Sequence, residues 1–349
     1  DDAATMLAPI VEMDPHVIRT LITESGNPGY AKIKAGVDPN QCRAARRING
    51  VGIESDWLRH YPLGRLTATI VGFTSTDNRG LEGLELQYDK RLKGSAARNI
   101  FFADVARRPI RLKQEEGVLR DGVGIILTLD ATIQKFARDE LVKQYEKYQA
   151  EAAVAVVADP KTGAILAMVS LPDFDPLEAG KTDPNYFRSR VITDWFEPGS
   201  VIKPIVMAIA LDAGAVKKDE QIFCENGSYG GKGFGRISEY LGGFGDLTPR
   251  EILVKSSNIG MAKIGQRLGK EKLHNGLRLF GFGDKTGIEL PGEVDGLVRP
   301  LQKWDGYSET RVPFGQEICV TAMQLVRAFC ILANAGRVIR PYMVKAIVQ

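Results

Sequence analysis

Apolar and polar positions follow different patterns in the two parts of this chain. Over residues 1–120 the apolar runs are short and are broken by Gly, Pro and Asn, so this part is predicted to be largely irregular. An amphipathic helix is predicted over residues 83–93, where Gly94 would end it. From Asp121 the pattern becomes regular, and a length of 349 residues also suggests two domains. We therefore expect domains at residues 1–120 and 121–349.

The second part predicts a helix, then a pair of strands, then more helices. Asp130 is a helix cap, and after it apolar residues recur at spacings of three and four up to Tyr148. The β-rich runs 152–158 and 164–170 are joined by a turn with Pro and Gly, which predicts a hairpin. A capping box at residues 248–251 begins a later helix. This order favours an α+β fold in which helices pack against an antiparallel sheet.

Composition narrows the class of protein without identifying a function. The chain is 44% apolar and 26% charged, as in ordinary globular proteins, and its net charge of +3 does not suggest nucleic acid as a partner. The four cysteines form no CxxC pair, so we expect free thiols and predict neither a metal site nor a cofactor. No apolar stretch reaches the ~18 residues that a membrane span needs. The chain begins at Asp1 without a leader, which suggests a processed protein or a fragment.

Chemistry is predicted first for residues 197–204, Glu-Pro-Gly-Ser-Val-Ile-Lys-Pro. The Pro-Gly turn places Ser200 at the start of a helix that is apolar up to Leu211 apart from Lys203, so the helix should be buried. Burial would lower the pKa of Lys203 and leave a neutral amine that can act as a base. A spacing of three places Ser200 and Lys203 on one helix face. Because the three histidines are isolated, a serine nucleophile here would need such a base rather than a Ser-His-Asp triad.

A second candidate element is Ser256-Ser257-Asn258, at the junction between two predicted helices. Such a junction would present Ser256 and Asn258 from rigid supports. A Ser/Asn helix cap is an alternative interpretation, and both can hold together. Residues 25–27, Ser-Gly-Asn, repeat the pattern in an irregular stretch, and we interpret them as a loop.

Ser200-x-x-Lys203 followed by Ser256-x-Asn258 resembles the motif set of the penicillin-binding proteins and serine β-lactamases, and further phrases narrow the resemblance to the class B penicillin-binding proteins. The likeness covers nearly the whole chain. Further phrases that carry it are residues 159–168, 280–283, 291–293, 315–316 and 320–325, and residues 79–85, which resemble a signature of the family's N-terminal pedestal. The resemblance implies a penicillin-binding transpeptidase domain, similar to the serine β-lactamases, with an antiparallel sheet flanked by helices. An irregular, partly β pedestal of the dimerisation type would precede it.

The implied activity is that of a peptidoglycan D,D-transpeptidase, which cross-links stem peptides through a serine acyl-enzyme. Ser200 would attack the penultimate D-alanyl carbonyl and Lys203 would accept the serine proton. Ser256 would pass a proton to the leaving amine, and Asn258 would hydrogen-bond the substrate backbone. The N–H of Ser200 would form half of an oxyanion hole. The septal, cell-division type looks closest, with the elongation and spore-cortex types as alternatives.

The resemblance also implies partners and a location. Donor and acceptor stem peptides would be substrates and β-lactams covalent inhibitors, while a membrane glycosyltransferase and other division proteins would be partners. The catalytic domain would lie on the extracytoplasmic (periplasmic) side of the bacterial cytoplasmic membrane, with a membrane anchor outside this chain. A serine β-lactamase is an alternative, but it would need a deacylating base and no pedestal. A catalytically silent scaffold or β-lactam sensor is another, which the presence of both Ser200 and Lys203 disfavours.

The family's third motif, Lys-Thr-Gly or Lys-Ser-Gly on an edge strand, has two apparent copies here. Residues 161–163 precede Ser200 and lie in the predicted hairpin turn, so their order and setting are wrong. Residues 285–287 lie in a Gly-rich connection where Pro291 and Gly292 prevent a long edge strand. We interpret both as coincidental and expect the third motif beyond Gln349.

Overall fold

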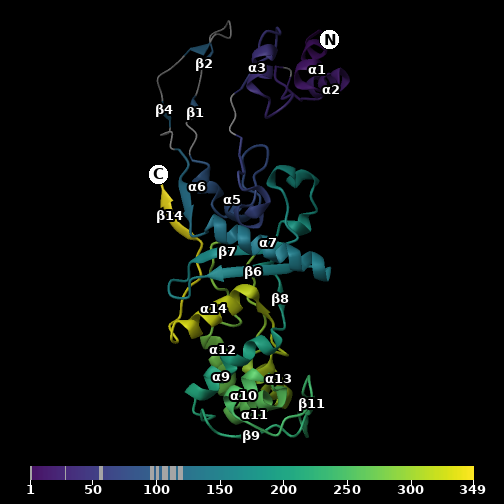
Figure 1. Cartoon of the computed structure of the whole chain (residues 1–349). Coiled ribbons are helices and arrows are strands. Elements are labelled where there is room, and N and C mark those ends of the chain that lie inside the picture. Colours follow the sequence, from purple (N-terminus) through teal and green to yellow (C-terminus); the bar gives the residue numbers. More distant parts are fainter. Residues whose placement is uncertain are drawn as a thin grey trace. The chain divides into compact units, whose positions relative to one another are not determined.

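The structure is a computed structural model that describes residues 2–27, 29–54, 58–94, 98–99, 102–103, 109–110, 115–116 and 121–349 (Figure 1). The chain divides into two units. Unit 1 comprises Asp1–Pro62 and Thr74–Arg79, and unit 2 comprises Leu63–Phe73 and Gly80–Gln349. The domain boundary predicted at residue 120 falls outside the described residues and stays a prediction.

Unit 1 contains three short helices that are not among the predicted elements. They are α1 (Asp2–Val11), α2 (Pro15–Thr23) and α3 (Pro39–Ala45), and side chains from all three form a small apolar cluster. Asp14 and Asp38 cap the second and third helices, each directly before a proline at the first helical position. These two Asp-Pro pairs are the helix signal that the irregular pattern of this stretch conceals.

The N-terminal part of unit 2 supplies side chains to the core of that unit. Its elements are η1 (Gly64–Leu66), α4 (Ala68–Val71), α5 (Gly83–Gln87) and α6 (Asp89–Leu92). The helix predicted over residues 83–93 is thus present as two short helices that meet at Tyr88. Ile70 and Leu84 are buried in the same apolar cluster as Ile165. Two antiparallel pairs of two-residue strands follow, β1 (Arg98–Asn99) with β4 (Glu115–Glu116) and β2 (Phe102–Ala103) with β3 (Pro109–Ile110).

The sheet that follows in unit 2 consists of two antiparallel strand pairs. β6 (Ala153–Ala158) pairs with β7 (Ile165–Leu171), and β5 (Gly124–Leu127) pairs with β14 (Val344–Val348). The two pairs meet where Ala164 forms a bridge to Tyr342. The hairpin predicted around the turn at residues 159–163 is confirmed.

Helices cover both faces of the β6–β7 pair. On one side lies α7 (Ala131–Tyr148), the predicted helix, whose cap Asp130 accepts hydrogen bonds from the N–H groups of Thr132 and Ile133. On the other side lies α14 (Ala322–Ala333), which contacts β6 (Figure 1). The predicted α+β arrangement, an antiparallel sheet flanked by helices, is therefore present.

Gln134 of α7 is buried, with 1% of its surface exposed, and its amide is fully paired with backbone. Its Nε2 donates to the carbonyl oxygens of Leu66 and Met168, at 2.8 and 2.9 Å. Its Oε1 accepts from the N–H of Met168 at 2.7 Å. This side chain therefore links α7 to β7 and to η1 through backbone groups alone.

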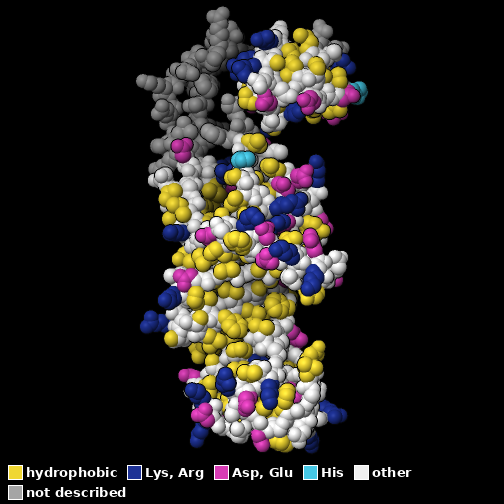
Figure 2. Space-filling model, in the orientation of Figure 1, with side chains coloured by type: hydrophobic (Ala, Val, Ile, Leu, Met, Phe, Trp, Pro, Cys, Tyr) yellow, Lys and Arg dark blue, Asp and Glu magenta, His cyan; other side chains and the backbone are white. Residues whose placement is uncertain are grey.

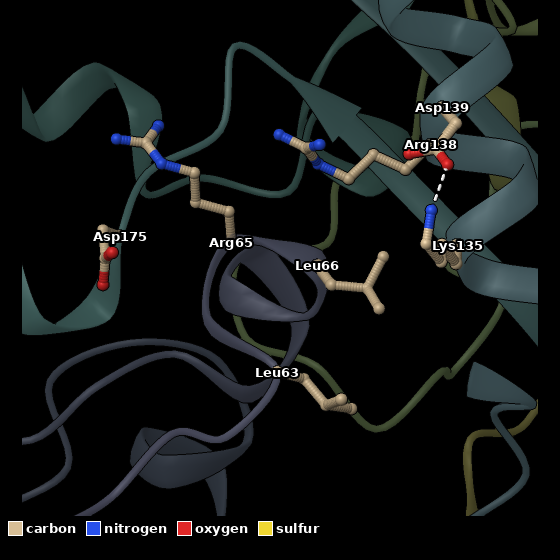
Figure 3. A pocket seen from close by; sticks show the side chains of 7 residues that line it. All are labelled: Leu63, Arg65, Leu66, Lys135, Arg138, Asp139 and Asp175. Carbon is tan, nitrogen blue, oxygen red and sulfur yellow. Dashed lines mark hydrogen bonds and ion pairs between the residues drawn. The ribbon is translucent and has the colours of Figure 1, made fainter. Parts of the chain in front are cut away.

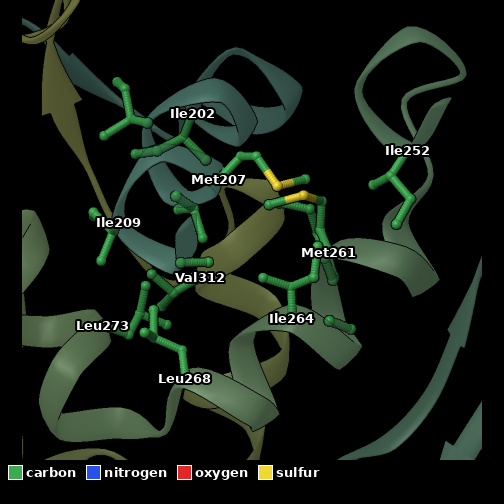
Figure 4. Close-up of a cluster of buried hydrophobic side chains, with 14 of the residues drawn as sticks. Ile202, Met207, Ile209, Ile252, Met261, Ile264, Leu268, Leu273 and Val312 are labelled. Carbon is green, nitrogen blue, oxygen red and sulfur yellow. The ribbon is translucent and has the colours of Figure 1, made fainter. Parts of the chain in front are cut away.

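A second, larger apolar cluster is built by helices of residues 199–333 (Figure 4). These are η4 (Gly199–Ile202), α9 (Lys203–Asp212), α10 (Pro249–Val254), α11 (Asn258–Leu268), α12 (Lys270–Leu279), α13 (Gly306–Arg311) and η6 (Val312–Phe314), with α14 at the edge. The capping box predicted at residues 248–251 is present at the start of α10. Met207 and Ile209 of α9 are buried in this cluster with Met261 and Ile264 of α11.

Shorter elements connect these helices. They are η2 (Pro176–Lys181), η3 (Pro184–Tyr186), α8 (Arg190–Thr193), β8 (Trp195–Phe196), β9 (Ile222–Phe223), β10 (Ser228–Gly231), β11 (Gly235–Ser238), β12 (Asp246–Leu247), η5 (Leu301–Lys303) and β13 (Val320–Thr321). The strands pair antiparallel as β8 with β13, β9 with β12 and β10 with β11. The β10–β11 hairpin ends beside α11.

The surface of unit 2 carries interspersed acidic and basic side chains on the face in Figure 2, in keeping with a net charge of +3. Among the described residues, no helix has the length and apolar character to cross a membrane.

Candidate active site

Ser200 lies in a tight turn that depends on a close approach between two glycines. Gly199, with φ +56°, donates its N–H to the carbonyl oxygen of Gly315 at 3.1 Å. Gly315 has φ +87°, and a Cβ atom there would lie 2.1 Å from the carbonyl oxygen of Gly199. Any side chain at position 315 would therefore collide with the turn, and glycine alone fits. The turn leaves Ser200 exposed at the surface of unit 2.

The helix after Ser200 is buried along most of its length but not all round. Ile202, Ile205 and Val206 are fully buried, whereas Val201 is 50% and Leu211 is 41% exposed. The expectation of a helix buried on every side is thus wrong at its two ends.

Lys203 is buried as predicted, with 2% of its surface exposed. Its Nζ donates to the carbonyl oxygen of Ser256 at 2.7 Å, to Ser256 Oγ at 3.0 Å and to Asn258 Oδ1 at 2.8 Å. These acceptors match the three protons of an ammonium group. Burial lowers the pKa of Lys203 to about 8, against the weaker opposing attraction of Glu239. The amine is therefore much easier to deprotonate than an exposed lysine.

The turn between α10 and α11 brings Ser256 and Asn258 to the same place. Ser256 has φ +54°, a left-handed conformation that costs a non-glycine residue about 1–3 kcal/mol and persists when neighbouring contacts hold it. Its Oγ donates to Ser200 Oγ at 3.0 Å. Ser257 caps α11 by accepting from the N–H of Gly260, as the helix-cap interpretation suggests. The motif thus both caps a helix and presents Ser256 and Asn258.

The four predicted site residues form one hydrogen-bonded cluster. A path runs from Ser200 Oγ through Ser256 Oγ to Lys203 Nζ, with 3.0 Å at each step. Ser200 and Lys203 are thus connected through Ser256 rather than by a hydrogen bond of their own. This arrangement can carry a proton from an exposed hydroxyl to a buried amine, which is what activation of a serine nucleophile requires. The individual catalytic roles stay predictions.

Glu239 is a site residue that the sequence pattern does not reveal. It follows β11 and accepts hydrogen bonds from Ser257 Oγ at 2.5 Å and from the N–H of Asn258 at 2.7 Å. It is joined to the motif by tertiary structure alone, since it belongs to a hairpin that precedes α10. An acidic residue in a hairpin has no spacing rule that would connect it to a helix start.

The two Lys-Thr-Gly copies make contacts away from the candidate site. Thr162 Oγ1 donates to Asp159 inside the β6–β7 turn. Thr286 is buried, and both its N–H and its hydroxyl donate to Glu293 Oε1. Arg340 holds the carbonyl of Gly287. None of these contacts involves the cluster around Lys203.

Other candidate chemistry in the described residues is limited. The four cysteines are free, and the described residues contain no group of three or more His, Cys, Asp or Glu placed to bind a metal. A surface pocket of about 400 Å³ is lined by Leu63, Arg65, Leu66, Lys135, Arg138, Asp139 and Asp175 (Figure 3). Its cations are largely matched, since Lys135 pairs with Asp139 at 2.5 Å and Arg138 pairs with Asp173 at 2.7 Å. We therefore take the cluster around Lys203 as the candidate active site.

Two known protein families match this chain. Residues 153–349 match the family described as "Penicillin binding protein transpeptidase domain". This chain belongs to the penicillin-binding proteins. Residues 2–122 match "Penicillin-binding Protein dimerisation domain", so the order of pedestal and transpeptidase domain agrees with the class B resemblance.

Proteins similar to this chain come from several bacteria. Stage V sporulation protein D of Bacillus subtilis is 36% identical over 85% of this chain and 46% of its own length. A probable peptidoglycan D,D-transpeptidase, PenA, of Neisseria meningitidis is 33% identical over 95% of this chain and 57% of its own. The crystal structure of penicillin binding protein 3 from Mycobacterium tuberculosis, complexed with aztreonam, matches with a TM-score of 0.71 and 31% identity, covering 83% of this chain and 61% of that one. The chain thus spans about half the length of the curated relatives it matches.

Proposed function

We propose that this protein is a peptidoglycan D,D-transpeptidase that works through an acyl-enzyme on Ser200. The observation that carries the proposal is the buried Lys203, whose Nζ lies 3.0 Å from Ser256 Oγ, itself 3.0 Å from the exposed Ser200 Oγ. Support also comes from the names of two relatives, one a probable D,D-transpeptidase and the other a penicillin-binding protein bound to a β-lactam.

Acylation begins when neutral Lys203 removes the proton of Ser200 through the Ser256 hydroxyl, which is hydrogen-bonded to both. Ser200 Oγ then forms a bond to the carbonyl carbon of the penultimate D-alanine. The C–N bond to the terminal D-alanine breaks, and its nitrogen takes a proton from Ser256, which regains one from protonated Lys203. The amine of a second stem peptide then attacks the carbonyl carbon of the acyl-enzyme, so that a new peptide bond forms and the bond to Ser200 Oγ breaks. The proton that the amine loses returns to Ser200.

Two groups in this cluster are suited to bind the substrate and its negative charge. The N–H of Ser200 lies at the start of η4, where it can donate to the oxygen that becomes negative in the tetrahedral intermediate. Asn258 is only partly buried, so its amide can hydrogen-bond a peptide backbone as well as Lys203. β-Lactams would be attacked in the same way and would leave a covalent adduct on Ser200.

The cellular setting that we propose is septal wall synthesis, on the extracytoplasmic side of the cytoplasmic membrane. A membrane glycosyltransferase and other division proteins would be the partners. Support for the septal role is the likeness of the motif phrases to that type. The relative from Bacillus subtilis is named for sporulation, and this favours a spore-wall role as the second candidate. Growth after depletion separates the two, because loss of a septal enzyme gives filaments whereas loss of a spore enzyme spares vegetative division.

Mass spectrometry of the intact protein after treatment with labelled penicillin tests the nucleophile. We expect one adduct, on the peptide that contains Ser200, and none in Ser200→Ala. Ser25→Ala is the matched control, because Ser25 belongs to the other Ser-x-Asn sequence and should not affect labelling. An adduct at another residue, or one that persists in Ser200→Ala, would contradict the proposal.

The lifetime of the adduct and transfer to an amine separate the alternatives. A transpeptidase releases penicillin slowly and transfers the donor peptide to a D-amino acid or a second stem peptide. A β-lactamase would turn penicillin over rapidly. A sensor would form the adduct but transfer no peptide.

A further inference from the structure

The end of the β10–β11 hairpin holds the start of α11 through main-chain and side-chain contacts. Glu239 Oε1 accepts from Ser257 Oγ at 2.5 Å, and its Oε2 accepts from the N–H of Asn258 at 2.7 Å. The N–H of Ile259 adds a longer contact of 3.3 Å to Oε1. A carboxylate at this end of an 11-residue helix is stabilised by the helix dipole and by charge-assisted hydrogen bonds.

The same hairpin end fixes the orientation of the Asn258 side chain. Asn258 Nδ2 donates to the carbonyl oxygen of Ser238 at 3.2 Å, while its Oδ1 accepts from Lys203 Nζ at 2.8 Å. The amide is thus held at both ends, by the hairpin on one side and by the buried amine on the other. Displacing the hairpin would therefore rotate Asn258 and remove an acceptor from Lys203.

Ser256 depends on the same support. Its left-handed backbone places both its carbonyl oxygen and its Oγ against Lys203, although a serine does not favour that conformation by itself. The next residue, Ser257, is fully buried and is held between Glu239 and the N–H of Gly260. Glu239 therefore holds the residues on the C-terminal side of the strained position.

Glu239 is also the charged group that faces Lys203. Glu239, after β11, is the charged side chain that acts on Lys203 of α9. Asp246 of β12 and Lys263 of α11 act instead on the thiol of Cys224, after β9, which Glu239 also affects. Glu239 raises the pKa of Lys203 and so opposes the effect of burial. Burial raises the pKa of the Cys224 thiol, which keeps that neighbour uncharged near neutral pH.

We propose that Glu239 is a positioning residue for acylation, which holds the Ser256–Asn258 turn against Lys203 and never touches the substrate. The proposal rests on the transpeptidase function proposed above. Removing the carboxylate has two separate consequences. The turn loses a bidentate acceptor, which slows acylation, and Lys203 loses its attractive neighbour, which makes the amine neutral at lower pH.

The test compares Glu239→Gln and Glu239→Asp with the wild type in the intact protein. The rate constant of acylation by a fluorescent penicillin is measured from pH 6 to 9.5. In Glu239→Gln we expect the plateau rate at high pH to be at least ~10-fold lower, because hydrogen bonds to a charged group are lost. We also expect the midpoint of the acid limb to lie at lower pH, because Lys203 is neutral at lower pH without the carboxylate. Glu239→Asp keeps the charge, so its midpoint should stay at the wild-type value while its rate falls less.

Glu225→Gln is the matched control. Glu225 lies just before the same hairpin and pairs with Lys263, away from the Ser256–Asn258 turn, so its rate and midpoint should equal those of the wild type. A wild-type rate in Glu239→Gln would overturn the proposal, and so would a slower rate with an unchanged midpoint, which is the result expected for a purely structural role. If Glu239→Gln does not fold, Glu239→Asp decides by its rate alone, because its retained charge leaves the midpoint unchanged in either case. A rate at least ~3-fold below wild type then supports the proposal, and a wild-type rate overturns it. Failure of the proposed function is distinguishable, because then the wild type itself is not acylated at Ser200.

Discussion

Two polar side chains are buried in different regions of unit 2, and their polar groups find hydrogen-bond partners of different kinds. Gln134 is 1% exposed in the sheet region and bonds to backbone groups of Leu66 and Met168. Lys203 is 2% exposed in the helical region and bonds mainly to groups of Ser256 and Asn258. Both are satisfied, as buried polar groups must be.

The difference lies in where the hydrogen bonds lead. Those of Gln134 end in the backbone of a strand and a turn, so they fix the position of α7. Those of Lys203 continue through Ser256 Oγ to Ser200 Oγ, which is exposed. A buried polar group that is connected to solvent-exposed hydroxyls can exchange protons with a bound molecule, whereas one enclosed by backbone can only stabilise. The comparison predicts that Lys203 is needed for chemistry and Gln134 for stability.

The largest effect is expected from Lys203→Met. The change keeps a long apolar side chain but removes the base, so acylation by penicillin should slow by ~10³-fold or more while the protein remains folded. Lys263→Met is the control, because Lys263 lies on α11 and pairs with Glu225 outside the cluster. Fluorescent penicillin labelling measures both. An acylation rate in Lys203→Met within tenfold of the wild-type rate would show that Lys203 is not needed for the chemistry.

The pH dependence of acylation gives the next largest effect. Burial holds the pKa of Lys203 at about 8, so the neutral base is lost as the pH falls through that value. Below pH ~7 the rate should fall about tenfold per pH unit, and it should level off above pH ~9. Stopped-flow kinetics with an uncharged β-lactam measures the profile. A rate that is constant between pH 6 and 9 would show that Lys203 is not the base.

The smallest effect on acylation, and the clearest on stability, is expected from Gln134→Leu. The N–H of Met168 and two carbonyl oxygens would lose their partner, so the free energy of unfolding should fall by about 2–3 kcal/mol. The acylation rate of the folded protein should not change. Gln144→Leu, at an exposed position of the same helix, should change stability by less than about 0.5 kcal/mol. Chemical denaturation measures both variants, and equal stabilities would show that the Gln134 contacts contribute little.

Local signals in the sequence predicted the elements that depend on near neighbours. The cap at Asp130, the turn at residues 159–163 and the capping box at residues 248–251 are all present. The pairing of β5 with β14 could not be predicted in this way, because the two strands are more than 200 residues apart and neither carries a signal for the other.

The candidate site likewise has features that local sequence signals predict and features that depend on distant parts of the chain. The presence of Ser200 and Lys203 in one cluster follows from their short spacing at a helix start, and burial of the lysine follows from its apolar surroundings. Glu239 and the left-handed conformation of Ser256 have no counterpart in the sequence pattern. Both arise from the way a hairpin packs on a helix start, which no local rule specifies.

The contact between Gly199 and Gly315 bears on how the site can change during evolution. Position 315 is far from the nucleophile in the sequence, yet a single added carbon there would lie 2.1 Å from the backbone next to Ser200. Val201, in contrast, is beside the nucleophile and half exposed. If Ser200 is the residue that β-lactams acylate, as proposed, substitutions that alter drug access should accumulate under antibiotic selection at exposed positions such as 201. A replacement at 315 would disable the proposed catalyst along with its sensitivity to the drug.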